Sequence, residues 1–166
     1  MSGSSNGKES VMKKTALSRT ISWEEVQRLA AAVAQDIRAS GFHPDCLIGI
    51  TVGGLIPLAL LSRELGVRDT RTISATSYSE NEQGSVTVSN IPADDLSGSK
   101  VLLIDEIADT GETLAQVSRV LRERCGALDI KIATLVVRTD KCKTRPDYSA
   151  LDCDRWVVFP WEATSG

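Results

Sequence analysis

The chain has 166 residues, of which 42% are hydrophobic and 25% are charged, and this length suits one globular domain with its own core. The formal net charge of −3 excludes a general basic surface for nucleic acid, so an anionic ligand would have to be held by local groups. No apolar run approaches the about 18 residues that a membrane-spanning helix needs.

Cysteine usage limits the chemistry further. The four cysteines form no C-x-x-C pair, and His43 is the single histidine. A zinc site and a disulfide framework are therefore not expected. We expect reduced thiols, with Cys46 and Cys125 packed beside apolar segments, and a cytoplasmic protein.

The ends of the chain differ from its middle. Residues 1–20 are rich in Ser, Gly and Lys with little periodicity, which predicts a disordered tail. Their basic excess leaves a transit peptide open as an alternative. We expect one domain over residues 21–162 and a short C-terminal tail over residues 163–166.

A capping box predicts the start of the first helix. In it the Ser22 hydroxyl accepts from the amide of Glu25, and the Glu25 side chain reaches back to the amide of Ser22. Apolar residues at helical spacing follow, up to Gly41. Further along, strands are expected over residues 46–50, 71–76, 101–104, 130–137 and 156–159, and helices over residues 55–65 and 112–124.

Residues 77–99 form a long polar insertion. Val86 and Val88 alternate with polar residues as in an exposed ribbon, and an insertion of this kind predicts a mobile arm over a site. Elsewhere strands alternate with helices, and the strands are near-continuous apolar runs. The fold class is therefore α/β, a Rossmann-like parallel sheet with helices on both faces.

The stretch KVLLIDEIADTGETL, residues 100–114, combines an apolar strand with acids and a small polar turn. Ligands bind beyond the carboxyl ends of the strands of such a sheet, where Asp105 and Glu106 lie. Their carboxylates suit hydroxyl groups or magnesium. The turn before the next helix offers backbone amides to a phosphate, and Gly111 permits close approach. A phosphorylated ribose has both features.

Simpler interpretations exist for the same residues. Asp105 and Glu106 could be a solvated strand end, and Asp109 could be only a helix N-cap. The Walker A pattern and G-x-G-x-x-G are both absent from the chain, which weakens a kinase or dehydrogenase interpretation.

The run VLLIDEIADTGET resembles the phosphoribosyl pyrophosphate (PRPP) signature of the type I phosphoribosyltransferases. The segments CLIGITVGGLIPLALLSRELGV, TSY, RPDY and WVVFPWE are similar, in order and spacing, to the purine enzymes of that family. By this resemblance Asp105 and Glu106 bind the ribose hydroxyls, directly or through Mg²⁺, and Asp109 manages the proton at the purine N7. The implied PRPP-binding set is Asp105, Glu106, Ala108, Asp109, Thr110, Gly111, Glu112 and Thr113.

The loop Thr51-Val52-Gly53-Gly54 matches the family's pyrophosphate loop, in which one peptide is commonly cis. Val52 departs from the family, which usually has Arg or Lys there. Backbone amides could suffice, or Arg63 or Arg71 could reach in. The resemblance therefore implies weaker binding of pyrophosphate and PRPP.

For the base, the resemblance gives Trp156 as the stacking aromatic, with core packing as the alternative, and the Val157 carbonyl as a reader of exocyclic groups. Arg138, or else Lys141, would donate to the purine O6. Ser77 and Tyr78 match the start of the mobile arm that closes over the reacting centre as a lid. Glu162 matches an acid that contacts a second magnesium, although a solvated carboxylate is the alternative.

The resemblance implies transfer of the phosphoribosyl group from PRPP to a 6-oxopurine (hypoxanthine, guanine or xanthine), in a magnesium-dependent homodimer or homotetramer. Two alternatives stay open. A catalytically weak PRPP- or nucleotide-binding regulator of the same fold is favoured by Val52, and a pyrimidine-type phosphoribosyltransferase or regulator is disfavoured by the WVVFPWE ending.

Overall fold

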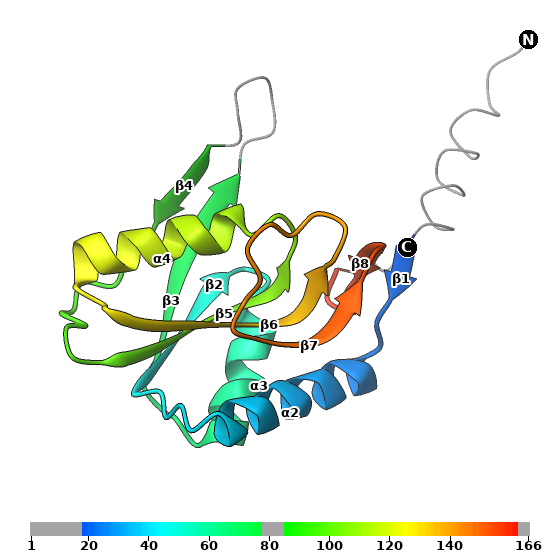
Figure 1. Ribbon diagram of the computed structural model, residues 1–166, viewed down its shortest axis with the longest axis horizontal. Helices are drawn as coiled ribbons and strands as arrows, with labels where there is room; N and C mark the ends of the chain where they lie inside the picture. Colours follow the sequence, from blue (N-terminus) through cyan, green and yellow to red (C-terminus); the bar gives the residue numbers. More distant parts are fainter. Residues whose placement is uncertain (1–17, 78–84, 163–166) are drawn as a thin grey trace, which may run out of the picture.

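The computed structural model describes residues 18–77 and 85–162, which form a central sheet between helices (Figure 1). The expected tails, and Tyr78 of the expected lid, lie wholly or mainly outside these residues. The helices are α2 (Trp23–Ala39), α3 (Leu55–Leu65) and α4 (Glu112–Cys125); the strands are β1 (Ser18–Thr20), β2 (Cys46–Thr51), β3 (Thr70–Ser77), β4 (Val86–Ser89), β5 (Lys100–Ala108), β6 (Asp129–Arg138), β7 (Tyr148–Cys153) and β8 (Trp156–Val158).

The main sheet has six strands in the order β4-β3-β2-β5-β6-β7. All neighbours pair in parallel except β4, which pairs antiparallel with β3. The Rossmann-like α/β prediction is thus confirmed. The exposed ribbon is also confirmed, because β4 alternates partly buried and exposed residues.

Helices cover both faces of the sheet, as the near-continuous apolar strands predicted. Helices α2 and α3 pack on one face, where Val33, Ile37 and Leu61 meet Leu47 and Leu102. Helix α4 covers the other face (Figure 1). Adjacent residues of β2 and β5 therefore serve two different cores, since side chains alternate across a strand.

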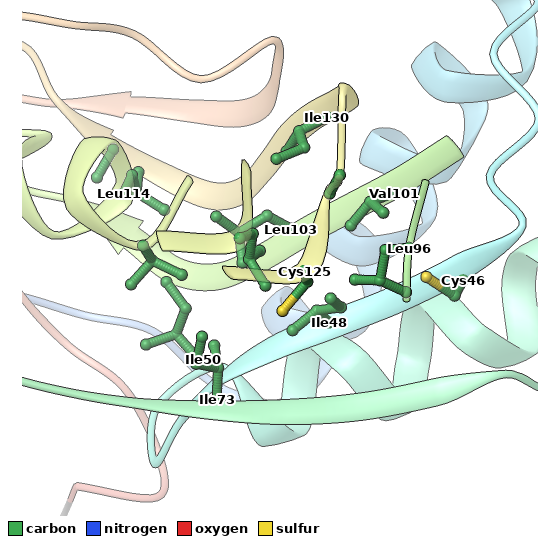
Figure 2. Close-up of a cluster of buried hydrophobic side chains, with 14 of the residues drawn as sticks. Cys46, Ile48, Ile50, Ile73, Leu96, Val101, Leu103, Leu114, Cys125 and Ile130 are labelled. Carbon is green, nitrogen blue, oxygen red and sulfur yellow. The ribbon is translucent and has the colours of Figure 1, made fainter. Parts of the chain in front are cut away.

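The core under α4 contains two of the cysteines (Figure 2). Cys46 and Cys125 are buried there among Ile48, Val101 and Leu103, and burial raises the pKa of both thiols. All four cysteines are unpaired thiols, as expected.

The start of α2 keeps only half of its predicted capping box. The Ser22 hydroxyl accepts from the amide of Glu25 at 3.1 Å. The Glu25 carboxylate, however, pairs with the guanidinium of Arg19 instead of reaching back. Arg19 can do this because it lies in β1, so the tail expected over residues 1–20 was wrong for residues 18–20.

In the C-terminal third one strand was not predicted, and one predicted strand has an unexpected partner. β7 lies between the strands predicted over residues 130–137 and 156–159, where no strand was predicted. Its polar residues concealed it, because it is an edge strand. β8 is a strand but does not join the main sheet. It pairs in parallel with β1 instead, a partner that the sequence pattern did not reveal.

Among the helices of the described residues, none combines the length and apolarity needed to cross a membrane.

Candidate active site

The carboxyl ends of β3 and β5 and the start of α4 line a cavity of about 330 Å³. Because the core strands are parallel, their carboxyl ends meet at one edge of the sheet. The cavity is lined by Ser77, Val86, Asp105, Ile107, Ala108, Asp109, Thr110, Gly111, Glu112, Thr113 and Leu114. The acidic strand and the threonine turn therefore share one pocket, as the sequence predicted.

Asp105 lies inside β5 rather than after it, because this strand runs on to Ala108. Its side chain is partly buried, and one carboxylate oxygen accepts from the amide of Glu106 at 2.8 Å. Burial raises the pKa of Asp105 to about 7, against the lowering effect of that hydrogen bond. The interpretation as a solvated strand end is therefore wrong for Asp105.

The Glu106 side chain, unlike that of Asp105, contacts Trp161 and the glycine loop. Its Oε2 accepts from the indole Nε1 of Trp161 at 2.9 Å. A Cβ on Gly53 would come within 2.3 Å of the Glu106 carboxyl carbon, so the carboxylate lies directly over the backbone of the glycine loop. Burial raises the pKa of Glu106, while the indole hydrogen bond lowers it.

The turn before α4 is shaped by Gly111, which is the N-cap residue with φ +88°. A side chain there would be strained, and its Cβ would lie 2.8 Å from the carbonyl oxygen of Thr144. The Thr110 hydroxyl accepts from the amide of Glu112 at 3.3 Å, and the Thr110 carbonyl accepts from the amide of Lys143 at 3.1 Å. Asp109 is thus not the N-cap, and that alternative is wrong.

The loop after β2 contains a cis peptide between Thr51 and Val52. The Thr51 hydroxyl lies 2.8 Å from that of Ser74, and the Ser74 hydroxyl accepts from the side-chain Nδ2 of Asn90 at 2.9 Å. A Cβ on Gly54 would lie 2.6 Å from the Ile50 carbonyl oxygen. The loop is therefore closely packed at its base.

Neither arginine considered for this loop can replace the missing cation. Arg71 lies at the other end of β3 and forms ion pairs with Asp69 and Asp94. Arg63 is in the last turn of α3, about 13 Å along the helix from Gly54 at 1.5 Å per residue. Val52 itself is 77% exposed.

Asp109 and Arg138 become neighbours through the register of β5 and β6. Ala108 pairs with Val137, so the next residue of each strand lies side by side. Arg138 Nη1 is 3.7 Å from Asp109 Oδ1, an oxygen that is buried without a hydrogen-bond partner. The buried Arg138 also forms a bidentate pair with Asp140, at 3.0 and 2.9 Å, and the hydrogen bond raises its pKa.

The other predicted residues lie near this edge with different environments. Trp156 is 56% exposed, so core packing does not explain it, whereas Val157 is buried. Lys141 is exposed on the loop after β6. Ser77 ends β3 and lines the cavity. Glu162 accepts from the amide of Phe159 at 2.9 Å, so it closes a turn rather than being merely solvated.

No group of three or more His, Cys, Asp or Glu side chains in the described part of the chain is arranged to hold a metal ion. The sequence also missed three contributors to the site: Trp161, Asp140 and Ser74. Trp161 and Ser74 act through contacts between distant segments, for which a single sequence carries no local pattern. Asp140 lies only two residues after Arg138, so the spacing of the two opposite charges was a local signal that could have found it.

The fold and this edge define an α/β protein with a pocket that joins an acidic strand to the start of a helix, and comparisons with known proteins give its family. Residues 22–165 match the family model described as "Phosphoribosyl transferase domain". The chain is 33% identical over 150 residues to a xanthine-guanine phosphoribosyltransferase of Cereibacter sphaeroides, covering 86% of this chain and 85% of that protein. A xanthine-guanine phosphoribosyltransferase of Chromohalobacter salexigens is 34% identical over 149 residues, covering 86% and 83%.

Among solved structures, a purine phosphoribosyltransferase from Pyrococcus horikoshii matches with a TM-score of 0.79 and 32% identity, over 90% of this chain and 97% of that one. The chain therefore belongs to the phosphoribosyltransferase family and is an enzyme of that family, which confirms the resemblance seen in its sequence.

The buried carboxylate of Asp105 should lower the stability of the ligand-free protein. In the ligand-free protein without divalent cations, Asp105→Asn should raise the free energy of unfolding near pH 8 by up to about 4 kcal/mol, because the folded state no longer holds a desolvated charge. An acid whose folded pKa is raised destabilises the fold as pH rises, so the gain should fall by about 2 kcal/mol near pH 5.5. Urea unfolding at the two pH values measures it; a gain independent of pH would contradict this account.

Proposed function

We propose that this enzyme transfers the 5-phosphoribosyl group from PRPP to a 6-oxopurine, giving a nucleoside monophosphate and pyrophosphate. The observation that carries the proposal is the pair Asp109 and Arg138, 3.7 Å apart beside the cavity of the acidic strand. O6 and N7 are adjacent on one edge of a purine, and a guanidinium can donate to O6. The names of the relatives support a purine substrate.

In this proposal each segment binds one part of the substrates. The amides and hydroxyls of Asp109–Thr113 hold the 5′-phosphate, and Asp105 and Glu106 bind the ribose hydroxyls. Asp109, which lines the cavity, takes the proton from the purine as the new bond forms. Trp156 stacks on the base, and the Val157 carbonyl reads its exocyclic groups.

Magnesium fits the donors that are present. Asp105 and Glu106 offer hard oxygen ligands, and Mg²⁺ is typically bound by one or two carboxylates together with water and substrate oxygens. When bound, it would neutralise charge on the departing pyrophosphate. Glu162 is a weaker candidate, because its carboxylate accepts from the amide of Phe159.

The glycine loop, Thr51 to Gly54, would bind pyrophosphate through backbone amides. Aligning base and sugar and stabilising the leaving group are the main demands of this reaction, so no covalent intermediate is needed. Assembly as a homodimer or homotetramer and a cytoplasmic location belong to the same proposal.

A catalytically weak PRPP- or nucleotide-binding regulator is the second candidate, and Val52 is the feature that favours it. A sensor of PRPP alone would need neither Arg138 nor Trp156. The deciding experiment incubates the protein with PRPP, Mg²⁺ and hypoxanthine, guanine, xanthine or adenine in turn, and follows nucleotide and pyrophosphate. We expect product from 6-oxopurines and none from adenine; calorimetric PRPP binding without any product would favour the regulator.

Arg138 should read the purine O6. Arg138→Ala should raise the KM for hypoxanthine or guanine at least about tenfold, the loss typical of a hydrogen bond to a charged donor, with the KM for PRPP little changed. Arg138→Lys, which keeps a donor, should recover part of the loss. Lys141→Ala is the matched control, because its side chain is exposed; the assignment fails if that variant shows the larger effect.

Because the Val52 side chain is exposed, an Arg can be placed there to supply the cation that relatives usually have at this position. Val52→Arg should lower the KM for PRPP about fivefold, because a guanidinium near the pyrophosphate adds charge-assisted hydrogen bonds. Val52→Gln gives a long side chain without charge and should leave that KM close to wild type. Initial rates at varied PRPP measure both variants, and an unchanged KM in Val52→Arg would refute our account of this loop.

A further inference from the structure

The C-terminal turn contacts Glu106, one of the two acids proposed to bind the ribose of PRPP, at a place that we call the sugar site. Trp161 is partly buried, and its indole Nε1 donates to Glu106 Oε2 at 2.9 Å across 55 positions of the chain. The Glu106 carboxylate also lies against the backbone of Gly53. Glu106 therefore contacts both the glycine loop and the indole of Trp161.

The indole is itself held by rings and by a closed turn. Trp161 stacks on Phe159, with ring centroids 4.7 Å apart and planes 12° from parallel, and its ring also contacts that of Trp23 at 5.8 Å. Phe159 is 1% exposed. The Glu162 amide donates to the Phe159 carbonyl at 3.0 Å, and the Glu162 carboxylate accepts from the Phe159 amide. The donor is thus preorganised.

A carboxylate that meets ribose hydroxyls or Mg²⁺ needs a defined direction, and a long Glu side chain has several rotamers to choose from. An N–H group that bonds one oxygen fixes the plane of the carboxylate and leaves the remaining lone pairs for a ligand. Because Trp161 follows β8 by three residues, the same short segment presents both Trp156 and the indole that holds Glu106.

We propose that Trp161 is a positioning residue for PRPP, which orients the Glu106 carboxylate through its indole N–H and connects the segment that carries Trp156 to the sugar site. The inference rests on the proposed function, because it takes Glu106 as a group that contacts PRPP. Trp161 itself acts through Glu106 and is not a catalytic residue.

The test compares Trp161→Phe, which keeps the ring stack and removes the donor, with Trp23→Phe, which keeps the same aromatic cluster and leaves the donor in place. Calorimetric titration with PRPP and Mg²⁺ should give a Kd about tenfold higher for Trp161→Phe, the loss typical of a hydrogen bond to a charged group. Trp23→Phe should bind within about twofold of wild type. In turnover, the KM for the base should change less than about twofold in both variants.

A double-mutant cycle separates positioning from general support of the fold. In a Glu106→Ala background, Trp161→Phe should have no further effect on the PRPP Kd, because the carboxylate that it orients is gone. Circular dichroism and thermal unfolding verify that each variant is folded, and a less stable variant is compared below its transition.

The outcomes are distinct. Wild-type protein that binds no PRPP would refute the proposed function itself. Wild-type binding, with an unchanged Kd in folded Trp161→Phe or with additive losses in the cycle, would refute the role of Trp161 alone. An equal rise in the KM for PRPP and for the base would also overturn it, since that pattern indicates a general disturbance.

Discussion

The parallel pairing of β2, β5 and β6 is the constraint on which the site depends. Parallel strands bring their carboxyl ends to one edge, and there the glycine loop, the acid pair and the buried arginine converge. Register matters as much as direction. The pairing of Ala108 with Val137 puts Asp109 beside Arg138, whereas a slip of one residue would turn each side chain to the opposite face.

Two carboxyl groups of the site lie where burial disfavours their charged form. Asp105 and Glu106 are both partly buried, and burial raises the pKa of each carboxyl group. In the ligand-free protein these groups cost stability, and a ligand with hydroxyls or a divalent cation offsets the cost on binding. Buried carboxylates that lower the stability of the ligand-free fold are common at sites shaped to bind a ligand.

Packing against glycine sets the distances between segments. Gly53 leaves room for the Glu106 carboxylate, and Gly111 leaves room for the Thr144 carbonyl. At both positions a loop closes onto a neighbour that is far away in sequence. The glycine loop thus has no cation at Val52, and its backbone at Gly53 is approached closely by a carboxylate.

The sequence by itself determined the α/β class, most strand and helix positions and the shared pocket of Asp105 and Thr113, because hydrophobic periodicity and the order of acid, glycine and threonine are local patterns. Only the tertiary structure decided that β8 pairs with β1, that β7 exists as an edge strand and that Trp161 bonds Glu106. Those features depend on strand register and on contacts between segments up to 138 positions apart, as in the pairing of Ser18 with Trp156, and such contacts arise only when the whole chain packs.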